Sequence, residues 1–206
     1  MTTARTGRAR RLAPEARRQA LIQATLPLVL RHGAAVSTRQ IAEAAGVAEG
    51  TIFGVFPGKD ALMQAVVAAA LDPAPSLREL ADIDRALPLR ARLVAVVHIL
   101  QCRFAEVFRL LDALGTIGPP PPSYPGPRSM NDAYRVAVAD VVGPDSAVLR
   151  VPALELAHVL RLLVFSGTHP RISDGLPLTA EQIVTILLDG LRHPPEPHHH
   201  TRDEPC

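Results

Sequence analysis

Apolar residues recur at helical spacing along most of this chain, which predicts a succession of α-helices. The first segment shows the pattern clearly, because Ile22, Leu26, Val29 and Leu30 fall on one face of a helix. Pro27 lies inside that helix, where it removes one backbone hydrogen bond, and we expect a kink there. No stretch alternates between apolar and polar residues for long. The pattern therefore predicts an all-α protein.

Further helices are predicted in the rest of the chain, separated by segments rich in Gly and Pro. Their expected ranges are 62–71, 77–82, 89–114, 129–142, 152–167 and 179–191. The inward face expected for the long helix at 89–114 is Leu93, Val96, Val97, Leu100, Phe104, Val107, Phe108 and Leu111. Breaks are expected at 72–75 and 143–145. Residues 118–128, GPPPPSYPGPR, are expected to form an extended, mobile loop.

Residues 37–62 predict two short helices joined by a tight turn and followed by a third helix. Ser37 can cap the first helix, which then starts near Thr38, while Gln40 three residues later bonds back to the cap. Gly46 follows the last apolar position of this helix and can adopt the left-handed conformation that ends it. Two short helices with this turn are typical of a helix-turn-helix that reads DNA.

The second helix of this motif is expected over residues 48–55, where Val47 and Ile52 face inward. Its exposed face is then Glu49, Thr51 and Gly54. Such a short polar face with little bulk can enter a major groove, with its N-terminal residues nearest the base edges. Ala48 cannot cap this helix, so its start is weak.

These motifs resemble those of the tetracycline-repressor-type (TetR) family of bacterial regulators. The matching runs are Ile41-Ala42-Glu43-Ala44-Ala45-Gly46-Val47, then Gly50-Thr51-Ile52-Phe53, then Phe56-Pro57-Gly58-Lys59-Asp60-Ala61-Leu62. The resemblance is strong over residues 14–71 and only architectural beyond them. It implies a three-helix helix-turn-helix DNA-binding domain followed by a helical domain for ligand binding and dimerisation. The residues expected to contact DNA are Thr38, Arg39, Ala48, Glu49, Gly50, Thr51, Phe53, Gly54 and Lys59.

Two positions depart from the family pattern. The family usually has Tyr where this chain has Phe53, and often His or Tyr where it has Val55, and both commonly bond DNA phosphates. Neither Phe53 nor Val55 can make such a hydrogen bond, so we expect a modest loss of affinity. Phosphate anchoring is then expected to rest on Thr38, Arg39, Thr51, the helix start at Lys59 and the arginine-rich N-terminal arm.

Charge is distributed unevenly along the chain, although the formal net charge is only +2. Residues 1–70 hold nine basic and four acidic residues, and the remaining residues hold 13 basic and 16 acidic. This is the pattern of a phosphate-binding module attached to a domain that does not bind nucleic acid. For the arginines at residues 5–11, a solvated tail is the alternative. Beside a helix-turn-helix, an arm that reaches toward DNA is favoured.

The expected organisation has four parts. They are a flexible basic arm at 1–13, a DNA-binding domain with a linking fourth helix at 14–71, a helical effector-binding and dimerisation domain at 76–193, and a disordered tail at 194–206. A chain of 206 residues is long enough for a small and a larger domain, each with its own core.

The helices expected at 152–167 and 179–191 carry large apolar residues on nearly every side, so each needs cover on more than one face. In the resembling family the last two long helices pair across a two-fold axis, which implies a homodimer; full burial inside a monomer is the alternative. The candidate interface residues are Leu156, Leu160, Leu163, Val164, Ile183, Ile186 and Leu187. A dimer requires a roughly palindromic operator in double-stranded DNA.

The resemblance also implies a repressor that a small molecule releases. The candidate pocket residues are Leu100, Phe104, Phe108, Leu111, Tyr134, His158, Leu162 and Phe165. This apolar set predicts a lipophilic effector, and an ordinary hydrophobic core is the alternative explanation of the same residues. His158 itself is expected to be a core histidine bonded to backbone. A regulator that responds to a protein partner, or to no ligand, is the second hypothesis.

The two cysteines, Cys102 and Cys206, fit a reducing compartment without a disulfide framework. Cys102 is expected to be a buried structural thiol, with oxidant sensing as the alternative. The histidines at 198–200 are expected to lie in a disordered tail, with a weak metal site as the alternative. No apolar run reaches the roughly 18 residues that span a membrane, and no cleavable signal is evident, so a cytoplasmic protein is expected.

An enzymatic function is not expected. It would require a nucleophile with a base, paired carboxylates, a metal cluster or a glycine loop that cradles phosphate, and the sequence contains no such constellation. Its glycines fall at helix ends instead. The prediction is accordingly a DNA-binding regulator without a cofactor or a metal.

Overall fold

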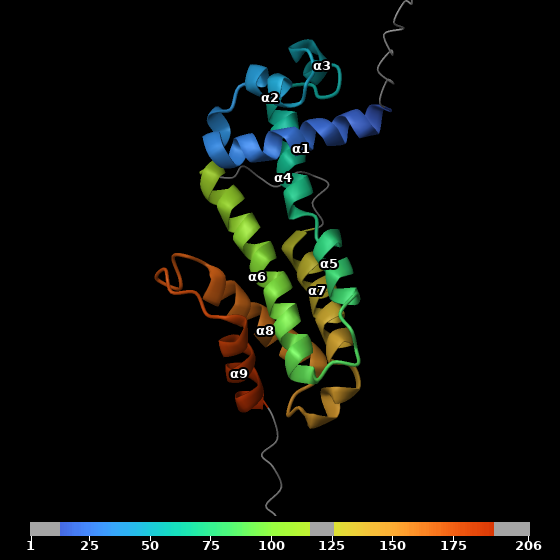
Figure 1. Cartoon of the computed structure of the whole chain (residues 1–206), viewed down its shortest axis with the longest axis vertical. Helices are drawn as coiled ribbons and strands as arrows, with labels where there is room; N and C mark the ends of the chain where they lie inside the picture. The colour runs from blue at the N-terminus through green and yellow to red at the C-terminus, as the bar shows by residue number, and fades with distance from the viewer. Residues whose placement is uncertain (1–12, 116–125, 192–206) are drawn as a thin grey trace, which may run out of the picture. The chain divides into compact units, whose positions relative to one another are not determined.

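The computed structural model describes residues 13–115 and 126–191, and these residues form helices without any strand (Figure 1). The helices are α1 (Pro14–His32), α2 (Thr38–Ala44), α3 (Glu49–Phe53), α4 (Lys59–Leu71), α5 (Ala74–Ala81), α6 (Leu89–Leu114), α7 (Gly126–Val142), α8 (Ala153–Thr168) and α9 (Ala180–Leu191). Two short 3-10 helices, η1 (Gly33–Ala35) and η2 (Gly143–Val148), follow α1 and α7. The all-α prediction is confirmed.

The chain divides into two compact units. The first unit consists of Met1–Asp72 with Ala105–Pro125, and the second of Pro73–Phe104 with Gly126–Cys206. One border therefore falls within the break expected at residues 72–75. The other falls inside α6, whose last turns belong to the first unit, and a helix shared between two units is not predicted by the sequence.

In the first unit, α1 packs against α2 and α4, and α2 packs against α3 (Figure 1). The buried apolar residues of this unit include Leu21, Ile22, Val29, Val36, Ile41, Ala42, Ile52, Phe56, Leu62, Val66 and Leu110. Leu110 comes from the last turns of α6. The sequence analysis puts Leu111 inside instead, but Leu111 is only half-buried. Near the end of α6, the buried face is thus turned around the helix axis, away from the face that a constant helical spacing of apolar residues along all of α6 predicts.

In the second unit, α7 packs against α5 and α8, and α8 packs against α9. The core of this unit is formed mainly by Leu93, Val96, Val97, Leu100, Val138, Val141, Leu156, Leu160, Val164, Ile183, Val184 and Leu187. Arg92 is buried among these elements, donates to the Val141 carbonyl at 2.7 Å and forms an ion pair with Asp145. The buried hydroxyls of Ser76 and Tyr134 share a hydrogen bond of 2.6 Å that joins α5 to α7.

Two helices begin earlier than the sequence predicts. α5 begins at Ala74 and α7 at Gly126, each three residues before its expected start. In both, a proline stands in the first turn, where its missing N–H costs no helical hydrogen bond. Residues 126–128 are therefore helical and not part of the expected loop. The rest of that loop, residues 118–125, lies outside the described residues, as do residues 1–12 of the arm and the predicted tail.

Candidate nucleic-acid interface

The start of α2 and the turn after it form as predicted, because local signals determine both. At the start, the Ser37 N–H donates to Gln40 Oε1 at 2.8 Å, and the Gln40 N–H donates to Ser37 Oγ at 3.2 Å. At the end, Gly46 has a φ of 65°, and the Val47 N–H donates to the Ala42 carbonyl at 3.0 Å. This bond is typical of a helix that a left-handed glycine ends.

The second helix of the motif, α3, is shorter than predicted. It runs over Glu49–Phe53 and not over residues 48–55. Its N-cap, Ala48, makes no side-chain hydrogen bond, as expected for an uncapped start. Ile52 is completely buried, which confirms its inward orientation, whereas Val47 is only half-buried. α3 therefore depends on packing through Ile52 more than on its own capping.

The outer side of α3 carries few groups that can form hydrogen bonds. The exposed residues at and beside α3 are Ala48, Glu49, Gly50, Phe53 and Gly54, while Thr51 is half-buried. Among these exposed residues, Glu49 alone has a polar side chain. Phe53 presents a large aromatic ring that is 54% exposed. On α3, therefore, the Glu49 carboxylate and the Phe53 ring are the main side-chain groups available to contact DNA bases.

Thr38 and Glu49, both candidate DNA contacts, are bonded to each other. The Thr38 hydroxyl donates to Glu49 Oε1 at 2.5 Å, joining the first residue of α2 to the first residue of α3. The sequence analysis assigns Thr38 to a phosphate, but a phosphate oxygen only accepts, and the single O–H of Thr38 is engaged by Glu49. In this structure the Thr38 hydroxyl proton is bonded to Glu49 and is not offered to a DNA phosphate.

The start of α4 is a second candidate contact. Lys59 Nζ donates to the Ala34 carbonyl at 2.7 Å, which ties α4 to the residues after α1. Gly58, the N-cap, provides no side-chain cap, so the first N–H groups of α4 have no side-chain partner there. The ammonium keeps its charge and two further N–H groups. Together with the exposed Arg39 and the half-buried Thr51, these groups remain candidates for phosphate anchoring in the described residues of the motif.

The eight candidate pocket residues do not share one environment. Leu100 and Tyr134 are buried in the core of the second unit. Phe104 and Phe165 are half-buried and pack edge to face, with ring centroids 5.5 Å apart. The others lie elsewhere: Phe108 and Leu111 belong to the first unit, and His158 and Leu162 are exposed. The structure thus puts two of the eight, Leu100 and Tyr134, in the second unit's core, while Phe104 and Phe165 form a half-buried pair in the same unit.

Two side chains that the sequence analysis puts inside the protein lie at its surface. His158 is exposed on α8, where it borders a shallow pocket whose other lining residues are Arg135, Pro152, Leu154 and Glu155. Cys102 is exposed on α6. The interpretations of His158 as a core histidine and of Cys102 as a buried thiol are therefore wrong. Cys102 lies two residues after the buried Leu100, about 200° around the helix, so helical geometry alone opposes its burial.

Most candidate interface residues are part of the chain's own core. Leu156, Leu160, Val164, Ile183 and Leu187 are at most 2% exposed, and Leu163 is half-buried. A second copy cannot contact side chains that this chain already covers. Ile186 is 51% exposed, and the same two helices expose Leu162, which the prediction assigns to the pocket, and Leu154, which it assigns to no site. An interface on α8 and α9 would therefore use Leu154, Leu162 and Ile186.

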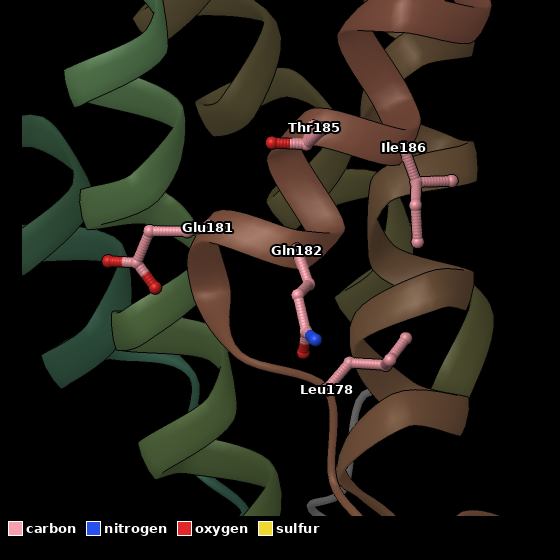
Figure 2. Close-up of a pocket in the computed structure, with 5 residues that line it drawn as sticks. All are labelled: Leu178, Glu181, Gln182, Thr185 and Ile186. Atoms are coloured by element: carbon pink, nitrogen blue, oxygen red, sulfur yellow. The ribbon is translucent and has the colours of Figure 1, made fainter.

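A shallow pocket on α9 includes Ile186. Its lining residues are Leu178, Glu181, Gln182, Thr185 and Ile186 (Figure 2). Figure 2 shows Glu181 extending toward the green helix α6 and Ile186 on the other side of α9. The pKa of Glu181 lies below its ordinary value, mainly because its carboxylate accepts from its own backbone N–H, then from the Thr179 hydroxyl, with a smaller attraction from His98. Mixed polarity of this kind suits a contact surface.

Across residues 13–115 and 126–191, no three His, Cys, Asp or Glu side chains are grouped so that they could hold a metal ion. In the same residues, no helix combines the length and the apolar character needed to cross a membrane. The histidines at 198–200, Cys206 and the arginines at 5–11 fall outside these residues.

Comparisons with known proteins agree with this geometry. Residues 21–66, which include α2, the turn and α3, match the model for bacterial regulatory proteins of the tetR family. A tetR-family transcriptional regulator from Streptomyces coelicolor is 25% identical, covers 86% of this chain and 80% of its own, and superposes with a TM-score of 0.57. Among curated proteins, none matches the sequence significantly.

Two further solved structures share the fold. A transcriptional regulator from Rhodococcus sp. Rha1 is 18% identical over 89% of this chain and 100% of its own, with a TM-score of 0.60. NalD of Pseudomonas aeruginosa, the secondary repressor of the MexAB-OprM multidrug efflux pump, is 20% identical over 87% of this chain and 98% of its own, with a TM-score of 0.50.

Proposed function

Since this chain belongs to the tetR family of bacterial regulatory proteins and is a DNA-binding transcriptional regulator, we propose that it is a dimeric repressor of a palindromic operator and that a lipophilic small molecule releases it. The observation that supports this most directly is the α2–turn–α3 motif. Its start is capped, its turn is closed by Gly46, and α3 exposes a face of small residues around Glu49 and Phe53. Such a face lets the helix backbone approach base edges closely.

The proposed dimer rests on the exposed apolar residues of α8 and α9. Leu154, Leu162 and Ile186 are 44%, 46% and 51% exposed, and large apolar side chains left this accessible favour contact with a partner. A two-fold interface is self-complementary, so the same residues would serve both copies. Two α3 helices related by that axis would bind half-sites of opposite orientation, which makes the operator palindromic.

The proposed effector site lies in the second unit. In this unit Leu100 and Tyr134 lie in the apolar core, Phe104 and Phe165 form a half-buried pair, and the buried Ser76 is already bonded to Tyr134. A ligand there would find few polar partners and would have to be lipophilic. α6 belongs to both units, so a ligand that displaces α6 would act on the unit that holds α3. Coupling of about 1–3 kcal/mol would change operator affinity about 5- to 150-fold.

One observation favours a second candidate function. His158 and Leu162 are exposed, and Phe108 and Leu111 belong to the first unit, so half of the candidate pocket is not in the second unit's interior. A regulator whose second unit binds a protein, or binds nothing, would need no enclosed pocket. Its DNA anchoring would be equally weakened by Phe53 and Val55.

The operator is tested by selecting bound sites from random duplex DNA with the purified protein. We expect a palindrome whose affinity, measured by fluorescence anisotropy, falls steeply with salt, because phosphate contacts release counterions. If no sequence is enriched and binding stays weak at low salt, operator binding is refuted. Light scattering of the same sample distinguishes a dimer from a monomer.

The effector is tested by thermal shift against a panel of lipophilic compounds. A compound that fills a site in the folded protein stabilises it by RT ln(1 + [L]/Kd). We expect at least one such compound to raise the melting temperature and also to lower operator affinity. Stabilisation of the protein without any loss of operator affinity would argue against release by a ligand.

A further inference from the structure

We propose that Glu49 reads the amino group of a cytosine in the operator half-site, that Thr38 positions Glu49 for this contact, and that Phe53 packs on the methyl group of a nearby thymine. The inference rests on the proposed function, because it requires α3 to lie in a major groove. It goes beyond that function by naming base pairs that the operator must contain.

The chemistry of a carboxylate restricts the bases that Glu49 can contact. An ionised carboxylate only accepts hydrogen bonds, and phosphates repel it, so it is suited to the groove floor and not to the backbone. In the major groove, guanine presents only acceptors and thymine an acceptor with a methyl group, whereas cytosine and adenine present an amino group. Adenine has the N7 acceptor beside its amino group, which repels the second carboxylate oxygen. Cytosine carries no acceptor beside the amino group on its own exposed ring edge, where it has only a C–H, and it is therefore the better partner.

The hydrogen bond from Thr38 holds the Glu49 side chain in place. Glu49 is exposed, and Thr38 donates to its Oε1 at 2.5 Å across the turn between α2 and α3. Oε2 then accepts the bond from the base. Because the side chain is already restrained, it loses less rotamer freedom when it binds DNA. Thr38 is thus a positioning residue, and its effect should appear as discrimination between bases more than as general affinity.

Phe53 lies four residues after Glu49, on the same side of α3 and one turn further along it. The ring is 54% exposed. The thymine methyl is the apolar group that the major groove offers to such a ring. One helical turn rises about 5.4 Å, and base pairs stack about 3.4 Å apart, so the thymine should lie one or two base pairs from the cytosine.

Between and beside these two residues, α3 has only small side chains that face outward. Gly50 and Gly54 are exposed, and a Cβ added at Gly50 would meet no heavy atom within 4 Å. Neither glycine offers a side chain that could read a base. Within the part of the half-site that α3 covers, Glu49 and Phe53 are therefore the side chains that distinguish one base from another.

The first experiment repeats the selection from random DNA with Glu49→Gln and with Glu43→Gln as the matched control. Glu43 is exposed on α2, so its replacement makes the same charge change without touching α3. We expect the wild type and Glu43→Gln to select the same cytosine. Glu49→Gln should select adenine at that position, because an amide can donate to N7 and accept from N6 together. An unchanged cytosine in Glu49→Gln overturns the assignment of Glu49.

The second experiment changes the DNA and keeps the wild-type protein, with one protein variant, Phe53→Ala, as the comparison. Replacing the cytosine pair by a thymine pair should weaken binding about tenfold, within the usual cost of one mismatched pair. Replacing the thymine by deoxyuridine removes only the methyl group and should weaken binding about threefold. Phe53→Ala should be insensitive to that replacement. A wild type that ignores deoxyuridine overturns the contact assigned to Phe53.

Thr38→Val tests the positioning role. Valine has nearly the shape of threonine but lacks the hydroxyl, so the tenfold preference for cytosine should fall to about threefold, while affinity for random DNA stays unchanged. Equal loss on all sequences would show that Thr38 contacts phosphate, which overturns its positioning role. If the wild type binds no sequence, the proposed function itself fails; if it selects an operator that Glu49→Gln selects equally, only this inference fails.

Discussion

The two units differ in where their buried polar side chains find partners. In the first unit, the buried hydroxyl of Thr25 donates to the Leu21 carbonyl, one turn earlier in the same helix, at 2.6 Å. In the second unit, the buried Arg92 donates to the Val141 carbonyl 49 residues away, and the buried Ser76 bonds both to the nearby Pro73 carbonyl and to the Tyr134 hydroxyl 58 residues away. The first unit thus satisfies its interior locally, whereas the second depends on polar links between helices. Replacing one buried polar side chain should therefore break a link between helices in the second unit but not in the first.

The largest effect is expected for Arg92→Met, which keeps an aliphatic side chain and removes every donor. Arg92 is 2% exposed, and its loss leaves the Val141 carbonyl and the Asp145 carboxylate without this partner. We expect the free energy of unfolding to fall by about 3 kcal/mol, chiefly because the Val141 and Val142 carbonyls lose a buried charged donor, whereas Asp145 is 41% exposed and can be hydrated. Urea unfolding followed by circular dichroism measures it.

The matched control for that variant is Arg90→Met on the same helix. Arg90 is exposed and donates to the Thr185 hydroxyl at 2.9 Å, so its replacement should change stability by less than about 0.5 kcal/mol. If Arg90→Met and Arg92→Met lower the free energy of unfolding equally, then the burial of Arg92 does not explain why its hydrogen bonds stabilise the second unit.

In the first unit, the position where a substitution should cost most stability is Gly33, which makes a close backbone contact and no polar side-chain bond. Gly33 has a φ of 59°, and a Cβ there would lie 2.4 Å from the Ala113 carbonyl oxygen within the same unit. We expect Gly33→Ala to destabilise this unit by about 2–3 kcal/mol, from the left-handed conformation and the clash together. Gly46→Ala has a similar φ of 65° but no heavy atom within 4 Å, so it should cost only about 1 kcal/mol.

Hydrogen exchange resolved by peptide measures both glycine variants, because it reports each unit separately. Amides of α1 to α4 should exchange faster in Gly33→Ala than in Gly46→Ala. If the two variants lose protection equally, the close approach to Ala113 contributes nothing and only the backbone conformation matters.

The features that the sequence predicts correctly act over short distances. Ser37 and Gln40 predict the start of α2, and Gly46 predicts its end, because each signal operates within about six residues of chain. The buried Ile52 follows from helical period in the same way. This locality is why the candidate DNA-binding motif could be recognised without a structure.

The features that the sequence does not predict depend on distant partners. The bond between Thr38 and Glu49 spans 11 residues and requires the crossing of α2 and α3. The spacing of Leu156, Leu160 and Val164 predicts one apolar face on α8, but spacing cannot show whether that face is covered by this chain or by a second copy. The sequence predicts that this face of α8 contacts a second subunit, whereas in the structure the chain's own helices bury it.

A smaller effect, common to both units, is expected from the two capping boxes. α9 begins like α2: the Thr179 N–H donates to Gln182 Oε1 at 2.8 Å, and the Gln182 N–H donates to Thr179 Oγ1 at 3.1 Å. Ser37→Ala and Thr179→Ala should each cost about 1 kcal/mol in urea unfolding. Equal costs would show that local signals weigh the same in both units. A cost above about 2 kcal/mol in the second unit alone would mean that its helix starts also depend on distant contacts.

The smallest effect has the opposite sign, because Arg161 of the second unit lacks the partners that Arg92 has. Its Nε, like that of Arg92, is buried without a hydrogen bond in the described residues, and its pKa is lowered from its ordinary value, first by burial and then by the charge of Arg135. A lowered pKa means that the fold disfavours the charged form. Since the group stays protonated up to a pH far above neutral, this cost does not titrate away between about pH 5 and 8.

We therefore expect Arg161→Met to raise the free energy of unfolding at every pH in that window. Much of the side chain is accessible to water, which screens the repulsion, so the gain should not exceed about 0.5 kcal/mol. Replacing Arg135 by Met first should reduce the gain, since the two charges no longer oppose each other, and a double-mutant cycle measures this coupling. A loss of stability in Arg161→Met would show that packing of the Arg161 methylene groups stabilises the fold by more than its charge destabilises it. Long-range polar partners would then contribute less to the stability of the second unit than the contacts of Arg92 indicate.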